Sequence, residues 1–300
     1  MTRRLTLRPG LAGLLALGAC AMPPAGPPVA PGLPVAAILA ETRETARFVD
    51  ARAVASDASG RLYVADAGRA QVVVFAPAGT VAAVLGGPGT TDEALAEPVD
   101  VDPTNGQAVY VADAGTGRVV RFTAERRAAE AIPIPDTAGD ALDARTAGAA
   151  DAPRGRPVGV AAGAGTDLVV AEARRGVVLV LDAARRVQRT VGPFRALAGL
   201  ASDARGRLFA LDGGTVRTVD AFGAPGRDLD TRALGPVRGV SVSDDLVLAA
   251  GDAGVAVFRV RTGEALAVVP SPVPLVDATA AGGVVWGLTR TGLVALGPVP

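Results

Sequence analysis

A short stretch of sequence occurs twice in this chain, and the repetition limits the folds it can adopt. Tyr-Val-Ala-Asp-Ala-Gly is found at 63–68 and again 47 residues later, at 110–115. Weaker copies begin near residues 168, 207, 246 and 284, which gives six copies in all. A period of about 40 residues is typical of chains built from repeated units that pack on one another. The repeat therefore predicts a modular fold with six units.

Each copy has the pattern of four short β-strands. Asp-Ala-Ser-Gly at 57–60 and Asp-Ala-Arg-Gly at 203–206 suit a tight turn between the first and second strands. The second strand ends in an acidic residue, a Gly-containing turn follows, and apolar runs such as 71–75 and 81–85 form the third and fourth strands. Four strands in about 40 residues, repeated six times, indicate an all-β fold, a six-bladed β-propeller of four-stranded blades.

The two ends of the chain predict how the ring closes. The sixth copy stops after its third strand, 293–296, so its fourth strand is missing. Val-Ala-Ala-Ile-Leu at 35–39 is nearly identical to Val-Ala-Ala-Val-Leu at 81–85, which is the fourth strand of the first copy. We expect the N-terminal strand, about 35–39, to complete the last blade, because closure removes free sheet edges. The propeller domain then spans 35–300.

The N-terminus predicts export and a lipid anchor. Three arginines among the first eight residues precede an apolar run, 11–19, that is too short to span a bilayer. The run ends in Leu-Gly-Ala-Cys, which resembles a bacterial lipobox. We therefore expect a lipoprotein signal peptide at 1–19 and lipidation of Cys20, and an ordinary secretory signal with an incidental cysteine is the alternative. The arginines also resemble the twin-arginine export motif, although a general export signal fits them better.

The segment after the cysteine predicts a tether. Residues 20–34 hold the lipidated cysteine followed by a stretch that is rich in proline and carries no charge, as expected of an extended spacer. Its acyl chains would anchor the protein to a membrane. Ala21 after the cysteine favours the outer membrane over the inner one, so we expect a bacterial cell-envelope protein on the periplasmic side.

The best-preserved copies resemble a known repeat family. An NHL repeat has Val-Ala-Asp, a small turn, an Arg, alternating apolar residues and a Phe. The matching residues of the second copy are Asp113, Gly115, Arg118, Val119 and Phe122. The resemblance covers roughly 35–300 and implies a propeller. Because members of this family include sensor domains, protein-interaction modules, RNA binders and a few enzymes, it implies an architecture without implying one function.

An acidic residue ends the second strand in four copies, and two interpretations of these acids are open. The residues are Asp66, Asp113, Glu172 and Asp212. Arginines lie in the adjoining turns, namely Arg69, Arg118, Arg174 and Arg290. Together with the acids they form a charged ring on one face, which could bind a ligand or a cation. A residue that recurs once in each blade is, however, what a structural role produces, with each acid accepting hydrogen bonds from turn N–H groups or pairing with an Arg. We favour the structural interpretation.

The first strands differ from one another where repeated strands should agree. In a propeller these strands line the central channel, and their middle position is Ala in the first copy, Gly in three copies, and Asp100 and Asp277 in the second and sixth. Arg52 and Arg238 precede the middle position in their blades. These four residues are our candidates for a ligand-binding site at the channel mouth. The alternative, which we favour for the two acids, is that they are solvated or paired with Arg52.

Composition excludes several chemistries. All thirty basic residues are Arg, and the chain has no Lys or His, so it lacks a histidine ligand for zinc, a Ser–His pair and a Schiff-base lysine. Equal numbers of acidic and basic residues argue against a nucleic-acid binder. A gluconolactonase-like metal site uses Glu, Asn and Asp, but the single Asn here is Asn105 in an outer turn, and an amidating-lyase-like site needs His.

We therefore expect a monomeric, non-catalytic binding platform with no cofactor and no metal. Its partner would be an envelope protein, a glycan or a small ligand, bound on the face that carries the insertions at 87–97 and 136–153. The alternative function is a gluconolactonase-like hydrolase or lyase with Asp100 and Asp277 in the central channel.

Overall fold

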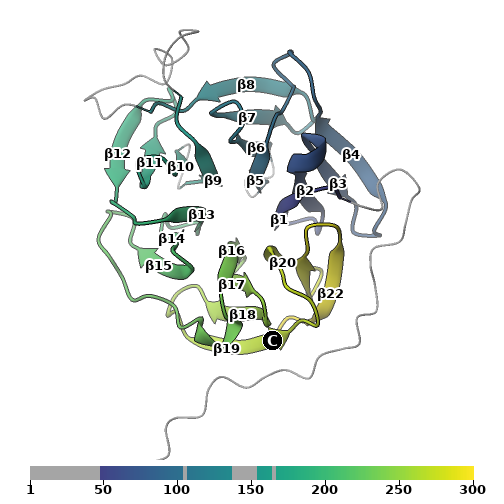
Figure 1. Ribbon diagram of the computed structural model, residues 1–300, viewed down its shortest axis with the longest axis vertical. Helices are drawn as coiled ribbons and strands as arrows, with labels where there is room; N and C mark the ends of the chain where they lie inside the picture. The colour runs from purple at the N-terminus through teal and green to yellow at the C-terminus, as the bar shows by residue number, and fades with distance from the viewer. Residues whose placement is uncertain (1–47, 104–106, 137–153, 164–166) are drawn as a thin grey trace, which may run out of the picture.

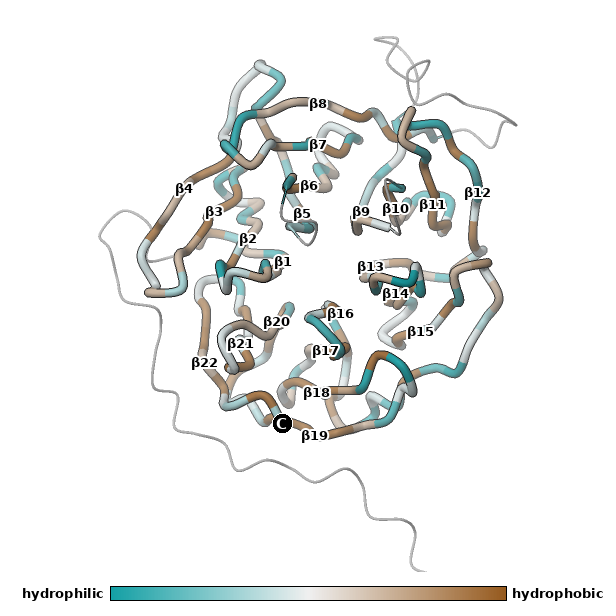
Figure 2. Tube along the Cα trace, turned by 180° about the vertical axis from the view of Figure 1, so that it is seen from behind, coloured by the Kyte–Doolittle hydropathy of each residue, from teal (hydrophilic) through white to brown (hydrophobic). Residues whose placement is uncertain are grey.

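The computed structural model describes residues 48–103, 107–136, 154–163 and 167–300. Within these residues, antiparallel strands form six sheets arranged in a ring (Figure 1). The prediction of an all-β, six-bladed β-propeller is confirmed. Figure 2 views the ring from behind and shows the first strand of every sheet nearest to the centre. We number the sheets as blades 1 to 6 in chain order.

Within each blade, the strands lie in chain order from the centre of the ring outwards. Each strand pairs with the next strand of the same blade. The four-stranded blades are blade 1 with β1 (Ala51–Ser56), β2 (Leu62–Asp66), β3 (Gln71–Phe75) and β4 (Val81–Gly86); blade 2 with β5 (Pro98–Asp102), β6 (Ala108–Asp113), β7 (Arg118–Thr123) and β8 (Ala128–Pro133); blade 3 with β9 (Pro157–Ala162), β10 (Leu168–Glu172), β11 (Val177–Leu181) and β12 (Val187–Val191); and blade 5 with β16 (Val237–Ser243), β17 (Leu246–Gly251), β18 (Gly254–Arg259) and β19 (Ala265–Pro270). The three-stranded blades are blade 4 with β13 (Leu197–Ser202), β14 (Leu208–Asp212) and β15 (Thr215–Val219), and blade 6 with β20 (Asp277–Ala281), β21 (Val284–Leu288) and β22 (Leu293–Pro298).

Blade 4 corrects the prediction that every blade has four strands. Residues 220–230 follow β15, but they make only an isolated bridge, between Pro225 and Val219. Proline has no N–H to donate to a ladder, so this position can offer one hydrogen bond fewer to the neighbouring strand. The N–H of Gly226 donates to the carbonyl of Thr218 at 2.8 Å, which still holds the segment against the edge of β15.

Apolar packing between neighbouring blades holds the ring together. The buried side chains form six clusters in the described part of the chain, and each cluster joins one blade to the next. Second strands such as β2, β6 and β10 are buried along their whole length. Outer strands such as β12 instead alternate between half-buried and exposed residues, because one face meets solvent. Burial therefore explains why the second strands have continuous apolar sequences.

Blades 6 and 1 close the ring through side chains and one backbone contact. Phe48 and Val64 of blade 1 pack in one cluster with Leu288 and Leu293 of blade 6. The N–H of Ala51 donates to the carbonyl of Arg290 at 2.9 Å. The strand expected at 35–39 lies outside the described residues, as do Cys20, the tether and most of the 136–153 insertion, so these remain predictions.

Helical structure in the described ranges is limited to short 3₁₀ turns, which include η1 (Ala67–Arg69) and η3 (Arg232–Leu234). None of the helices described has the length and apolar character needed to cross a bilayer. The tight turns between first and second strands depend on their Asp, as expected from the sequence. Asp57, for example, accepts hydrogen bonds from the N–H groups of Ser59 and Arg61 at 2.9 and 3.1 Å.

Candidate functional site

One face of the ring carries the beginnings of the first strands and the ends of the second strands, and we call it the entry face. The register shows this directly, since Ala51 at the start of β1 pairs with Asp66 at the end of β2. The turns that follow the second strands, and the segment 87–97 that leads into β5, lie on the same face. Whatever enters the central channel from this face therefore meets both sets of residues that the sequence singles out.

The four acids at the ends of second strands are buried and bind the segment that leads into the first strand of their own blade. Asp66 accepts hydrogen bonds from the N–H groups of Val49 and Asp50, and Asp113 accepts them from those of Ala96 and Glu97 at 3.2 and 2.7 Å. Each acid thus joins two parts of one blade.

The same arrangement continues in the next two blades. Glu172 accepts from the N–H groups of Arg156, Arg174 and Arg175 at 2.8–2.9 Å, and Asp212 accepts from that of Ala196 at 2.7 Å. These acids are 0–7 % exposed, so their oxygens are directed at the backbone and away from any ligand. The sequence predicts that these acids bind turn N–H groups and Arg side chains, which account for only part of the contacts. The segment that leads into the first strand of each blade supplies the other N–H donors, and no sequence pattern indicated that role.

Asp100 and Asp277, which share the aligned middle position of the expected first strands, each bind the neighbouring blade, although β20 begins only at Asp277. One oxygen of Asp277 accepts a hydrogen bond from the N–H of Val54 in blade 1, and one oxygen of Asp100 accepts from the N–H of Val160 in blade 3, both at 2.8 Å. Gly159 occupies the same position in blade 3, where an added Cβ would lie 2.8 Å from the backbone nitrogen of Leu200. The middle position therefore faces the next blade, and it holds either a small residue or an acid that bonds across the gap.

Burial makes both channel carboxyls hold their protons more tightly than usual. Desolvation is the main cause for Asp277, and it raises the pKa of this carboxyl to about 7. Desolvation also raises the pKa of Asp100 well above its usual range, and the nearby carboxyls of Asp277 and Asp102 raise it further. The second oxygen of Asp277 has no hydrogen-bond partner in the structure. A protonated, neutral carboxyl suits such a site.

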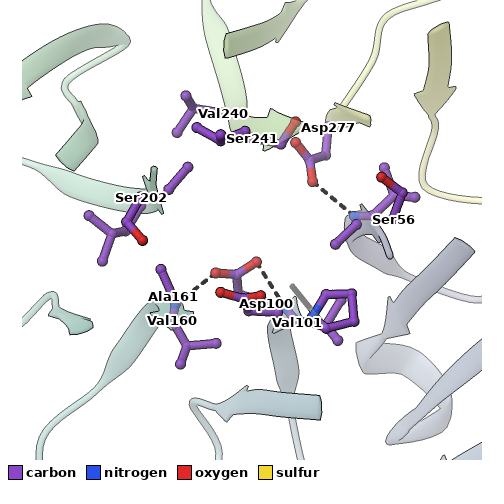
Figure 3. Close-up of a pocket in the computed structure, with 16 residues that line it drawn as sticks. Ser56, Asp100, Val101, Val160, Ala161, Ser202, Val240, Ser241 and Asp277 are labelled. Atoms are coloured by element: carbon purple, nitrogen blue, oxygen red, sulfur yellow. Dashed lines mark hydrogen bonds between the residues drawn. The ribbon is translucent and has the colours of Figure 1, made fainter. Parts of the chain in front are cut away.

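The two acids line a narrow cavity in the channel. Figure 3 shows Asp100 and Asp277 entering this space from different strands, with Ser241 beside Asp277 and with Ser202 across the space from Ser56. Its volume is about 40 Å³, enough for a few water molecules at roughly 10–15 Å³ each. Across the described ranges, no group of three or more His, Cys, Asp or Glu side chains is placed to hold a metal ion. The channel cavity is thus too small for an organic substrate.

A much larger pocket opens above the channel on the entry face, and we call it the mouth pocket. Its volume is about 600 Å³, within the usual range for small-molecule sites. Its apolar wall includes Val99, Val158, Leu197, Ala198 and Leu211, and its charged residues are Arg52, Glu97, Arg156, Arg238 and Arg290. The pocket combines an apolar surface with several guanidinium groups.

The arginines of the mouth pocket are held by carboxylates at its edge. Asp50 accepts hydrogen bonds from Nε and Nη2 of Arg52 at 2.9 and 2.5 Å, and its other oxygen accepts from Arg290. Arg238 forms an ion pair with Asp252 at 2.7 Å. These contacts fix the orientation of the side chains before any ligand arrives.

The structure therefore divides the four residues predicted at the channel mouth between two cavities. Arg52 and Arg238 line the mouth pocket, whereas Asp100 and Asp277 line the channel cavity. The alternative in which the acids pair with Arg52 is wrong, because the partner of Arg52 is Asp50. Arg290 was expected only as one of the turn arginines beside the repeated acids, and Arg156 was not among the candidates, because it lies in a connecting segment outside the aligned first strands.

Comparison with known proteins identifies the fold. No protein-family model matches the chain, and no curated protein matches it in sequence. Solved structures similar to it include virginiamycin B lyase from Staphylococcus aureus, at 12% identity over 84% of this chain and 85% of that one, with a TM-score of 0.56. A streptogramin B lyase is similar at 11% identity over 84% and 94% of the two chains, with a TM-score of 0.57.

A third similar structure is a catalytically inactive histidine-to-alanine variant of the same S. aureus lyase with quinupristin, at 11% identity over 86% of each chain and a TM-score of 0.55. At such low identity these similarities establish the shared β-propeller and nothing about the reaction.

Proposed function

We propose that this protein is a non-catalytic ligand-binding propeller whose mouth pocket holds a small molecule with an apolar body. The observation that carries the proposal is the contrast between the two cavities on the central axis, about 600 Å³ at the mouth and about 40 Å³ in the channel. A ligand can enter the first, whereas only water-sized species fit the second. Binding therefore takes place above the channel acids.

A lyase or hydrolase is the second candidate, because similar propellers are streptogramin B and virginiamycin B lyases. The inactivity of the histidine variant of the S. aureus protein weighs against the same chemistry here, since this chain contains no histidine. Acid–base groups near the axis include Asp100, Asp102 and Asp277, but these line the narrow cavity. The comparison therefore supports a binding surface more than a shared reaction.

The proposal predicts that filling the mouth pocket abolishes binding. Ala198 is exposed on the apolar wall, so Ala198→Trp adds bulk to the pocket without straining a buried site. We expect the wild-type protein to bind the fluorescent dye 1-anilinonaphthalene-8-sulfonate at one saturable site, and the variant to bind it at least about tenfold more weakly. Fluorescence titration measures both affinities.

Ala58→Trp is the matched control, since Ala58 is an exposed residue in a turn on the opposite face. It should bind the dye as the wild-type protein does. Equal binding by the Ala198→Trp variant would remove the mouth pocket as the site.

We also propose that the propeller is tethered to a bacterial membrane by lipid on Cys20. The lipobox-like Leu-Gly-Ala-Cys and the proline-rich segment after it support this. Cys20→Ser should move the protein from the membrane pellet to the soluble fraction, because the lost acyl chains supply the membrane affinity. Met22→Ser, which changes a neighbouring residue and keeps the cysteine, should stay in the pellet. Retention of the Cys20→Ser protein would contradict the anchor.

A further inference from the structure

One side of the mouth pocket carries three arginines, and the other side is mainly apolar, apart from Arg156, which is paired with Glu97 at 3.2 Å. Three arginines come from consecutive blades around the ring, namely Arg238 in blade 5, Arg290 in blade 6 and Arg52 in blade 1. On the remaining side, Val99 of blade 2 and Val158 of blade 3 take the position that Arg52 has in blade 1. A ligand that fills the pocket therefore meets guanidinium groups at one end and apolar side chains at the other.

Two of these arginines share one carboxylate. Asp50 accepts two hydrogen bonds from Arg52 and one from Arg290, and all three side chains remain partly exposed. A guanidinium has five N–H donors, so the pair has more donors than one carboxylate can accept. Two positive charges with one negative charge leave this corner of the pocket with a net positive charge and with donors to offer to an anion.

The apolar side is open because the turn of blade 4 is short. Gly213 and Gly214 connect β14 to β15 with φ of 60° and 82°, a conformation that suits glycine. A Cβ at Gly213 would meet no atom within 4 Å, so the space beside the turn is empty. An apolar body can therefore lie against Leu197 and Leu211 while its polar end reaches the arginines.

We propose that the mouth pocket selects an anionic amphiphile, a small molecule with one carboxylate, sulfonate or phosphate group on an apolar body. The anion would bind Arg52 and Arg290, with Arg238 adjacent, and the apolar body would lie over the side formed by blades 2 to 4. This inference rests on the proposed function, because it names the ligand class of the same pocket. Charge-assisted bonds to arginine make the anionic group the main source of selectivity.

Two dyes with the same ring system test the inference. 1-Anilinonaphthalene-8-sulfonate carries a sulfonate, and N-phenyl-1-naphthylamine lacks it. We expect the wild-type protein to bind the sulfonate dye at least about tenfold more tightly. The double variant Arg52→Gln, Arg290→Gln should lose that preference and keep its weak affinity for the neutral dye. Arg186→Gln removes an exposed Asp182-paired arginine on the opposite face and should change neither affinity.

The outcomes separate this inference from the proposed function. Equal affinity for the two dyes, or an unchanged preference in the double variant, would overturn the anion selectivity while leaving a ligand pocket. Failure of both dyes to bind at a saturable site would overturn the pocket itself together with the inference. Loss of sulfonate-dye affinity with added salt, without loss of neutral-dye affinity, would support the arginine contact.

Discussion

Glu172→Ala is expected to lower the free energy of unfolding by about 4 kcal/mol. The carboxylate is fully buried and accepts three backbone N–H groups, those of Arg156, Arg174 and Arg175, at 2.8–2.9 Å. Alanine leaves these donors without their acceptor, and each unsatisfied buried donor costs about 1–3 kcal/mol. Three such donors would cost about 3–9 kcal/mol in total, and water entering the turn would satisfy some of them, which places the expected change near the lower end of that range. Urea denaturation followed by circular dichroism measures the change.

Two further variants separate the structural role of Glu172 from the loss of a charge. Glu93→Ala removes an exposed carboxylate on the same face and should change stability by less than about 0.5 kcal/mol. Glu172→Asp keeps the charge but shortens the side chain. Gly155 leaves room for the longer residue, since a Cβ there would lie 2.9 Å from Cγ of Glu172. We therefore expect Glu172→Asp to be destabilised as well. Wild-type stability of the Glu172→Ala variant would contradict the prediction, because it would show that Glu172 does not join the segment before β9 to the turn after β10.

The repeated features of the fold could be predicted because they recur in the sequence. The copies at 63–68 and 110–115 indicate the blade length. Continuous apolar runs indicate the inner strands, and alternating apolar residues indicate the outer strands. Blade 4 is the exception. Residues 220–230 make an isolated bridge at Pro225 where the period predicts a regular fourth strand.

The candidate site could be predicted only in part, because its residues come from non-repeated connections. Arg52 and Arg238 could be found because they interrupt aligned strands. The contact of Arg290 with Asp50 could not be predicted, since it joins residues 240 positions apart and depends on the closure of the ring. The direction of Asp277 toward Val54 likewise depends on how blades 6 and 1 pack, which sequence spacing does not specify.

Asp277→Asn is expected to make the protein more stable than the wild type above pH 7 and to leave it nearly unchanged near pH 4. Asp277 is 6% exposed, and only one of its oxygens has a hydrogen-bond partner in the structure. Its carboxylate is therefore poorly compensated when ionised. Asparagine is nearly the same size, carries no charge and can still accept the hydrogen bond from Val54.

The pH dependence follows from the raised pKa. The pKa of Asp277 is about 7 in the folded protein, so the carboxyl keeps its proton up to that pH, whereas the unfolded chain releases it near the ordinary value of 3.8. The folded state therefore binds more protons between these values, and its stability falls as pH rises by about 1.4 kcal/mol per unit. This contribution is fully present below about pH 4 and is lost above pH 7, with an upper limit of about 4 kcal/mol over the window.

Urea unfolding of the wild-type protein and the Asp277→Asn variant at pH 4.5, 6 and 8 measures this contribution. The stability difference should grow steadily in favour of the variant across the three pH values. Asp100 has a raised pKa for the same reason, so the single variant should retain some pH dependence and the Asp100→Asn, Asp277→Asn double variant should retain less. A constant difference across the series would mean that Asp277 is ionised in the folded protein at every pH tested. The channel would then have to hold a compensating charge, and the carboxyl pair would regain its place as a candidate site.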